Sequence, residues 1–165
     1  LYRSSDGSVY EGYFIGDVFQ RGIVNLNYEN GDKYKGNFSN GKKNGDGTLF
    51  KSNGDEYFGV WSNDKLTLGT YTQSNGTIEY FPKDEKVESM NGIKYIYTDN
   101  LRRTGGIFYD DGSIYIGEFE FGLRHGSGRM VSSRGVGLSA STCSFGKVKY
   151  IEYEYDIKSG PRTIC

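Results

Sequence analysis

The chain has 165 residues, the size of one domain, with 25 glycines, 15 tyrosines and 10 phenylalanines but only 2 prolines. Alanine, the best helix former, occurs once, so helix bundles and Rossmann-type folds are poor candidates. The net charge is −1, so the chain lacks the basic excess that is typical of nucleic-acid-binding proteins. The two cysteines make no disulfide framework and mildly favour a reducing compartment, and no apolar run is long enough for a membrane-spanning helix.

A motif of the form Tyr-x-Gly-x-aromatic recurs along the chain and predicts repeated strands. It begins at Tyr10, Tyr34, Tyr57 and Tyr115, and the first three copies are 24 and 23 residues apart. An Asn-Gly or Asp-Gly pair precedes each motif, with its glycine three residues before the tyrosine. Such pairs are strong hairpin signals because both residues tolerate positive φ. A second glycine-rich turn and a second short strand follow, so one unit comprises two strands and two turns.

The units follow one another in chain order. The clear units lie near 10–31, 34–54, 57–76 and 115–131, and degenerate units occupy 77–112. The units at Tyr10 and Tyr57 have one residue fewer in the second turn than the other two. Residues 1–7 are similar to residues 49–54, which indicates that the chain starts on the second strand of an earlier unit and is a piece of a longer protein. We expect one continuous sheet over residues 1–131.

The unit resembles the MORN repeat, whose pattern runs roughly Tyr-Glu-Gly-x-Trp-x-Asn-Gly-Lys-x-x-Gly-x-Gly. Residues 34–50 match this pattern almost position by position, and residues 115–131 match nearly as well. The resemblance implies an all-β fold, an elongated single-layer antiparallel sheet of consecutive β-hairpin repeats. It also implies roles in binding, since some MORN proteins hold a partner helix or peptide in the groove of the sheet.

One face of the predicted sheet should be aromatic. Alternate residues of a strand share a face, so in each motif two aromatic residues flank a glycine. We expect a ring of the next unit to cover that glycine, which builds a ladder of rings in place of a second layer. The predicted partner-binding stripe is Tyr10, Phe14, Tyr34, Phe38, Tyr57, Trp61, Tyr115 and Phe119. The leading hypothesis is a non-enzymatic scaffold that binds a protein partner in the cytoplasm, at a membrane or at the cytoskeleton.

Charge separates the two sets of turns and supports an alternative. Turns within units carry Arg21, Lys42, Lys43, Lys65 and Arg124, whereas turns between units carry Asp6, Glu29, Asp32, Asp55, Glu56, Asp110 and Asp111. In a flat sheet the two sets fall on opposite rims. The basic rim predicts peripheral binding to anionic phospholipid through Lys42, Lys43, Lys65 and Arg124, which the MORN resemblance also implies. Simple solvation of the turns is the other interpretation.

No group of residues indicates an enzyme. His125 is the single histidine, which we interpret as a turn residue, and a catalytic pair with Cys143 is the alternative. The glycine clusters precede strands, whereas a phosphate-binding loop precedes a helix. We therefore predict no catalytic residue, no metal and no cofactor. A regulatory repeat domain of a larger enzyme stays open, because MORN repeats precede enzyme domains in some proteins.

Residues 132–165 fit no repeat unit. Residues 150–157 alternate between apolar and acidic side chains, which predicts a strand. We interpret 132–165 as a C-terminal cap that covers the last sheet edge, because an open edge invites strand pairing. A homodimer seam is the alternative, which the resemblance supports because some MORN proteins self-associate through terminal repeats.

Overall fold

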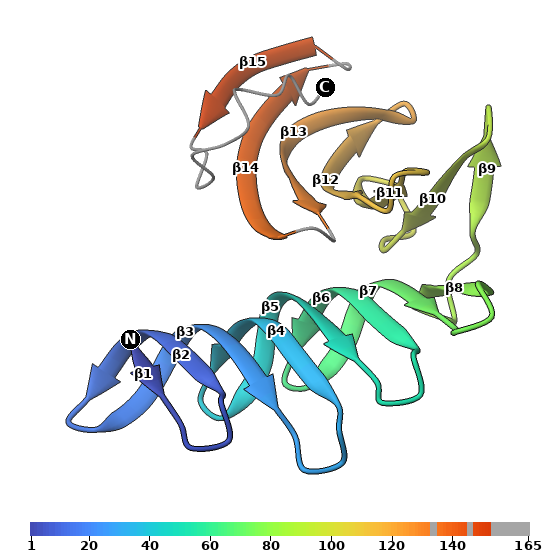
Figure 1. Ribbon diagram of the computed structural model, residues 1–165. Coiled ribbons are helices and arrows are strands. Elements are labelled where there is room, and N and C mark those ends of the chain that lie inside the picture. Colours follow the sequence, from blue (N-terminus) through green and yellow to red (C-terminus); the bar gives the residue numbers. More distant parts are fainter. Residues whose placement is uncertain (133–134, 145–146, 153–165) are drawn as a thin grey trace. The chain divides into compact units, whose positions relative to one another are not determined.

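The structure, a computed structural model, describes the backbone of residues 1–132, 135–144 and 147–152 and the side chains of residues 1–131. Every element in these ranges is a β-strand, and the strands pair antiparallel in two sheets (Figure 1). This confirms the predicted all-β hairpin fold, which the abundance of Tyr, Phe and Gly favours. None of the described residues forms a helix that is long and apolar enough to cross a membrane.

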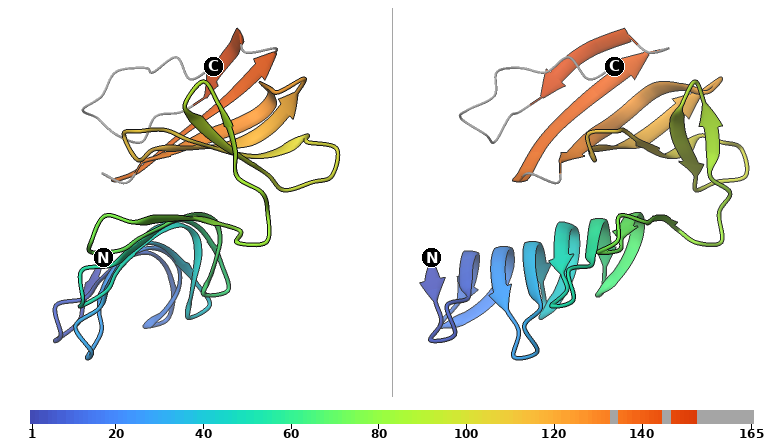
Figure 2. Two further views of the ribbon diagram at one scale, coloured as in Figure 1. Left: turned by 90° about the vertical axis from the view of Figure 1, so that its right-hand side faces the viewer. Right: turned by 45° about the vertical axis from the view of Figure 1, so that its right-hand side comes forward.

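The first sheet contains eight strands in their order along the chain. They are β1 (Tyr2–Arg3), β2 (Val9–Ile15), β3 (Val18–Asn27), β4 (Lys33–Ser39), β5 (Lys42–Phe50), β6 (Glu56–Ser62), β7 (Lys65–Thr72) and β8 (Ile78–Phe81). This sheet is a single curved layer, as its end-on view shows (Figure 2). Because the strands keep their chain order in the sheet, each pairs only with strands adjacent to it in the sequence.

The second sheet contains seven strands, again in chain order. They are β9 (Glu88–Met90), β10 (Ile93–Tyr97), β11 (Thr104–Phe108), β12 (Ile114–Glu120), β13 (Leu123–Ser132), β14 (Gly135–Ser144) and β15 (Lys147–Glu152). The degenerate region 77–112 thus supplies β8 to β11. In the expected cap, β14 pairs with the outer edge of β13 and β15 pairs with β14. Residues 153–165, which include most of the predicted alternating strand, lie outside the described part.

The single sheet expected over residues 1–131 is instead divided between β8 and β9. The chain forms two compact units, Leu1–Lys83 and Asp84–Cys165. Pro82 follows the last residue of β8 and has no N–H to donate to a ladder, so pairing ends there. The next four residues, 83–86, are all charged, which disfavours a strand.

The turns between units differ from the predicted two-residue turns. Gly31 has a φ of +85°, whereas Asn30 before it does not adopt a positive φ. The N–H of Gly31 donates to the carbonyl of Tyr28 at 3.0 Å, and the N–H of Tyr28 donates to that of Asp32 at 2.9 Å. The same bonds recur at Gly54 and Gly76. These are longer hairpin turns that need positive φ only at glycine.

True two-residue turns join strands within some units. Asn40 and Gly41 have φ values of +49° and +75°, and Asn91 and Gly92 have values of +52° and +82°. Both central residues are left-handed, as a type I′ turn requires. Asparagine tolerates this region better than other residues that carry a Cβ atom.

Phe121 occupies the same kind of turn at the tip of the β12–β13 hairpin. It has a φ of +51°, Gly122 after it has +76°, and 87% of its surface is exposed. A bulky residue in this region is strained by roughly 1–2 kcal/mol. We therefore expect Phe121→Asn to raise the free energy of unfolding by about 1 kcal/mol in urea titrations. The reverse change in the matching turn, Asn40→Phe, should lower it by a similar amount, and equal stability of all three proteins would contradict this explanation.

Glycine pairs set the register of every clear unit. Gly12 pairs with Gly22, Gly36 with Gly47, Gly59 with Gly69, and Gly117 with Gly128. The shorter units keep this register because a bulge in the second strand absorbs the difference. In β3 the bulge is the single residue Gln20. In β5 the bulge is larger, because residues 44–46 lie opposite the single residue Asn37 of β4. The glycine that the shorter units retain is therefore the one that opposes the glycine of the motif.

Candidate functional site: the aromatic face of the first sheet

The first sheet has an aromatic face, formed by the side chains that share a side with Tyr10, Gly12 and Phe14. Rings follow one another along it at centroid distances of 4.4–6.5 Å, mostly tilted or edge to face, as aromatic pairs prefer. The row consists of Tyr2, Tyr10, Phe14, Phe19, Phe38, Tyr34 and Trp61, and a separate stacked pair consists of Tyr57 and Tyr71. The predicted aromatic ladder is therefore present in this sheet.

The centre of the aromatic face is its core. Val24, Leu26, Tyr34 and Trp61 form a buried cluster, with Tyr34 fully buried and Trp61 only 4% exposed. The remaining stripe residues of this sheet, Tyr10, Phe14, Phe38 and Tyr57, are partly buried. The central rings thus stabilise the sheet, and the partly buried rings are the ones that still present surface.

The glycine pair of the second unit is covered mainly by the tyrosine of the same unit. A Cβ atom built on Gly47 would lie 2.2 Å from the hydroxyl oxygen of Tyr34, which donates a hydrogen bond to the Asn37 carbonyl at 2.8 Å. The ring of the next unit also contributes, because Nε1 of Trp61 donates to the Gly47 carbonyl at 2.9 Å. We expected a ring of the next unit to cover the glycine, whereas the tyrosine of the same unit lies closest and the ring of the next unit adds a hydrogen bond.

The second sheet repeats this arrangement. Its buried cluster contains Tyr97, Ile107, Tyr115 and Phe119, with Tyr115 fully buried. A Cβ atom on Gly128 would lie 2.1 Å from the Tyr115 hydroxyl oxygen. Burial raises the pKa of Tyr115 to about 12, so its phenol stays protonated at neutral pH. The two stripe residues of this sheet are therefore core residues too.

Two of the predicted lipid-binding cations lie over aromatic rings. Lys43 and Arg124 each stand nine residues after a motif tyrosine. The Nζ atom of Lys43 lies 5.7 Å from the ring centre of Tyr34, and Cζ of Arg124 lies 5.5 Å from that of Tyr115. Such cation–π contacts stabilise the ring stack. The equivalent positions in the other units hold Phe19 and Leu66.

The basic rim is thus divided between packed and exposed cations. Lys43 also forms an ion pair with Asp64 at 3.1 Å, and only 14% of its side chain is exposed. Arg124 donates to the hydroxyl oxygen of Tyr109 at 3.1 Å. Lys42 and Lys65 are exposed at the β4–β5 and β6–β7 turns. Of the four predicted lipid contacts, these two are the most accessible.

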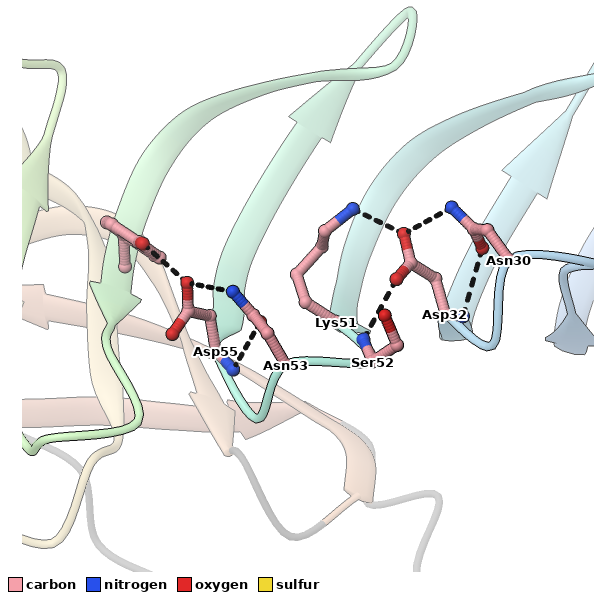
Figure 3. A network of polar contacts seen from close by, with 7 residues as sticks. Asn30, Asp32, Lys51, Ser52, Asn53 and Asp55 are labelled. Atoms are coloured by element: carbon pink, nitrogen blue, oxygen red, sulfur yellow. Dashed lines mark hydrogen bonds and ion pairs between the residues drawn. The ribbon is translucent and has the colours of Figure 1, made fainter.

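Carboxylates at the opposite rim link consecutive turns (Figure 3). Asp32 accepts the backbone N–H of Ser52 in the next turn at 2.9 Å and forms an ion pair with Lys51. Asp55 accepts the N–H of Ser74 at 2.9 Å and the hydroxyl of Tyr71 at 2.7 Å. The acidic rim was predicted from charge alone, but its role in joining neighbouring turns was not.

These bonds predict a dependence of stability on pH. The bond from Lys51 lowers the pKa of Asp32, and the bond from the Tyr71 hydroxyl lowers that of Asp55. A carboxyl whose pKa is lower in the folded chain stabilises the fold above its unfolded pKa of about 3.9 and loses this effect as pH falls through the folded value. We expect the free energy of unfolding to fall below about pH 4. Asp55→Asn should flatten this fall, and an unchanged pH profile would contradict the assignment.

His125, the one histidine, lies in strand β13, where it pairs with Glu118, so its interpretation as a turn residue is wrong. Its Nε2 atom lies 3.2 Å from a carboxylate oxygen of Glu120. The ladder pairs Cys143 with Gly126, the residue after His125, but the side chain of Cys143 lies outside the described part. A catalytic pair between His125 and Cys143 thus stays untested.

Strand pairs joined by repeated turns define the class of β-hairpin repeat proteins. In the units of Tyr34 and Tyr115 the tyrosine also packs over the glycine pair. The model of the MORN repeat family matches residues 34–56 and 115–136, which cover β4–β5 and β12–β13. The chain therefore contains MORN repeats at these two places. MORN repeats are generally modules of protein or membrane interaction. No curated protein matches the chain significantly.

The sequence analysis missed two residues of the aromatic face. Phe19 lies 5.3 Å from both Tyr10 and Phe14 and joins them to Phe38. Tyr2 continues the row at its open end. An alignment of second strands would have found Phe19, because it occupies the position of Lys43 and Arg124.

Proposed function

We propose that the aromatic face of the first sheet docks an apolar segment of a partner protein, so that the chain acts as a non-enzymatic scaffold module. One observation supports this proposal above others. Partly buried rings continue the buried core along a sheet face that no second layer of the same sheet covers. Large aromatic side chains at the margin of a rigid core serve well as binding anchors, since little conformational entropy is lost when they bind.

The accessible anchors lie toward the β1 end of the row. Tyr2 is more than half exposed, and Tyr10, Phe14 and Phe19 are partly exposed. Trp61 is unsuitable as an anchor because its ring is already packed on Tyr34 and beneath Lys43. The proposed contact surface is therefore Tyr2, Tyr10, Phe14, Phe19 and Phe38, with the buried rings as its support. The setting we propose is the cytoplasm, at a membrane or the cytoskeleton.

Strand β2 provides a matched experiment. Tyr10 and Phe14 lie on the aromatic face, whereas Tyr13 and Ile15, 56% and 60% exposed, alternate with them on the other face. The protein captured from source lysate by the wild-type chain should be lost with Tyr10→Ser/Phe14→Ser and kept with Tyr13→Ser/Ile15→Ser. Circular dichroism should show that both variants remain folded. Loss of capture with the second variant alone would overturn the proposal.

Peripheral membrane binding is the second candidate, supported by the exposed Lys42 and Lys65 at neighbouring turns. Each cation near an anionic surface contributes about 1 kcal/mol. Lys42→Glu/Lys65→Glu should abolish co-sedimentation with phosphatidylserine vesicles. Lys33→Glu/Lys35→Glu makes the same charge change at two exposed positions within β4 and should have less effect. Equal loss in both variants would indicate nonspecific charge attraction.

Two further roles are proposed for the whole protein. If residues 132–165 form a homodimer seam, light scattering should give twice the 18.5 kDa of the chain. A monomer at all concentrations would reject the seam. If the repeats regulate an enzyme, a catalytic domain must lie elsewhere in the full-length sequence, which sequencing of the complete transcript would decide.

A further inference from the structure

The chain contains six Asn-Gly pairs, and the structure divides them by the way it holds the asparagine. An Asn-Gly pair is chemically labile, because the backbone nitrogen of a glycine can reach the side-chain carbonyl carbon of the asparagine without steric hindrance. In all six pairs the residue after the asparagine is glycine, so the missing side chain leaves the backbone nitrogen equally unhindered. Any difference between them in the folded chain must therefore come from structure.

Three asparagines are held in the turns between units. The side-chain oxygens of Asn30, Asn53 and Asn75 each accept the backbone N–H two residues later, at 3.0, 3.0 and 2.8 Å. The side-chain nitrogens of Asn30 and Asn53 also donate to the carboxylates of Asp32 and Asp55. These bonds restrain rotation of the side-chain carbonyl, which must reorient before the glycine nitrogen can attack it.

The glycine nitrogens of these three turns are held as well. The N–H groups of Gly31, Gly54 and Gly76 donate to carbonyls three residues earlier, at 3.0, 3.0 and 2.8 Å. A nitrogen must lose its proton before it attacks a carbonyl carbon, and a donated hydrogen bond opposes that loss. Both reacting groups are thus restrained in every between-unit Asn-Gly turn.

Asn40 and Asn91 differ on both counts. They lie in the two-residue turns that join β4 to β5 and β9 to β10, where asparagine and glycine are exposed. Among the described residues, neither side-chain amide forms a hydrogen bond, and the N–H groups of Gly41 and Gly92 make none of the turn bonds described above. A Cβ atom built on Gly41 or Gly92 would meet nothing within 4 Å, so the space around each glycine is open.

Asn44, the sixth asparagine, lies inside strand β5. Its side-chain nitrogen donates to the Ser39 hydroxyl oxygen at 2.9 Å. It is therefore restrained by a bond to a neighbouring strand and is set apart from the two free amides.

We propose that Asn40 and Asn91 are the sites at which the folded chain deamidates. The deprotonated nitrogen of Gly41 or Gly92 attacks the asparagine Cγ, a C–N bond forms, and ammonia leaves with the proton taken up from solvent. Water then opens the resulting succinimide at one of its two C–N bonds and yields aspartate or isoaspartate. The step needs only water and involves no oxidant or reductant.

Each event changes a hairpin tip in two ways. A new carboxylate at position 40 lies two residues from exposed Lys42 and reduces the positive charge of that rim. The isoaspartate product also adds a methylene to the main chain of a two-residue turn, which disturbs the φ values that the type I′ geometry requires.

The test follows all six sites in one sample. The full chain is incubated in mildly alkaline buffer, native and in urea, and peptide mapping by mass spectrometry gives the rate of aspartate and isoaspartate formation at each pair. In urea the six rates should be similar. In the native chain Asn40 and Asn91 should react at least about tenfold faster than Asn30, Asn53 and Asn75, because each restraining hydrogen bond adds to the barrier.

The outcomes are distinct. Native rates that are equal across the five turn sites, or faster at Asn53 than at Asn40, would overturn the proposal. Asn40→Gln should remove the product at position 40 and leave the rate at Asn91 unchanged. A rate at Asn91 that changes with the stability of this variant would show that the reaction proceeds through global unfolding, and the assignment to local turn geometry would fail.

Discussion

Gly47→Ala should lower the free energy of unfolding by about 3 kcal/mol or more, at the upper end of the range for an overpacked core. The added methyl group would lie 2.2 Å from the Tyr34 hydroxyl oxygen and 2.6 Å from Cζ of the same ring. Tyr34 is fully buried among Trp61, Val24 and Leu26, so its ring has no room to withdraw. The hydrogen bond from its hydroxyl to the Asn37 carbonyl would also be lost.

Gly41→Ala is the matched control for this effect. Its φ of +75° makes an alanine there strained, but nothing lies within 4 Å of the added carbon. It should cost only about 1 kcal/mol. Urea unfolding of both variants, followed by circular dichroism, separates steric insertion from backbone strain. Equal destabilisation would contradict the assignment of the Gly47 site to the Tyr34 ring.

Trp61→Ala should be the most damaging single truncation in the first sheet, with an expected loss of about 3–5 kcal/mol. The indole packs edge-on against Tyr34 at 5.9 Å, lies beneath Lys43 and donates to the Gly47 carbonyl of the preceding unit. Removal of the side chain leaves a cavity between two units and removes a buried hydrogen bond.

Trp61→Phe separates these contributions. It keeps most of the ring packing but removes the N–H donor, so its expected cost is about 1–3 kcal/mol. Trp61 is the only tryptophan, so its fluorescence in the wild-type chain reports the unfolding of the first sheet. Thermal melts of the variants by circular dichroism complete the comparison. A phenylalanine variant as unstable as the alanine variant would show that the bond to Gly47 dominates.

Residue pattern alone predicts which face of each strand is aromatic, because alternation fixes the side of the sheet. It also predicts the repeat and the hairpins, since the spacing of Tyr and Gly is regular. It does not predict which ring covers Gly47, because that depends on the direction of the Tyr34 side chain within its own unit. Similarly, the charge of Lys43 suggested a surface contact, whereas its position nine residues after Tyr34 places its Nζ atom over the ring.

The turns show a second limit of sequence interpretation. Asn30-Gly31 and Asn40-Gly41 are identical dipeptides that form different turns. The difference arises from the strands on either side, which set how many residues remain to close the hairpin. Likewise, the first sheet ends at Phe81 because Pro82 and the four charged residues after it disfavour a further strand, a signal that the sequence itself contains.

The consecutive strand order has a consequence for how the chain acquires its structure. Each described strand pairs only with a sequence neighbour, so the loops that must close are short and the relative contact order is low for an all-β protein. All-β folds are usually slow to form because they join distant segments. This chain can instead build each sheet by adding one hairpin to the preceding one, and a growing nascent chain could do so as each unit emerges from the ribosome.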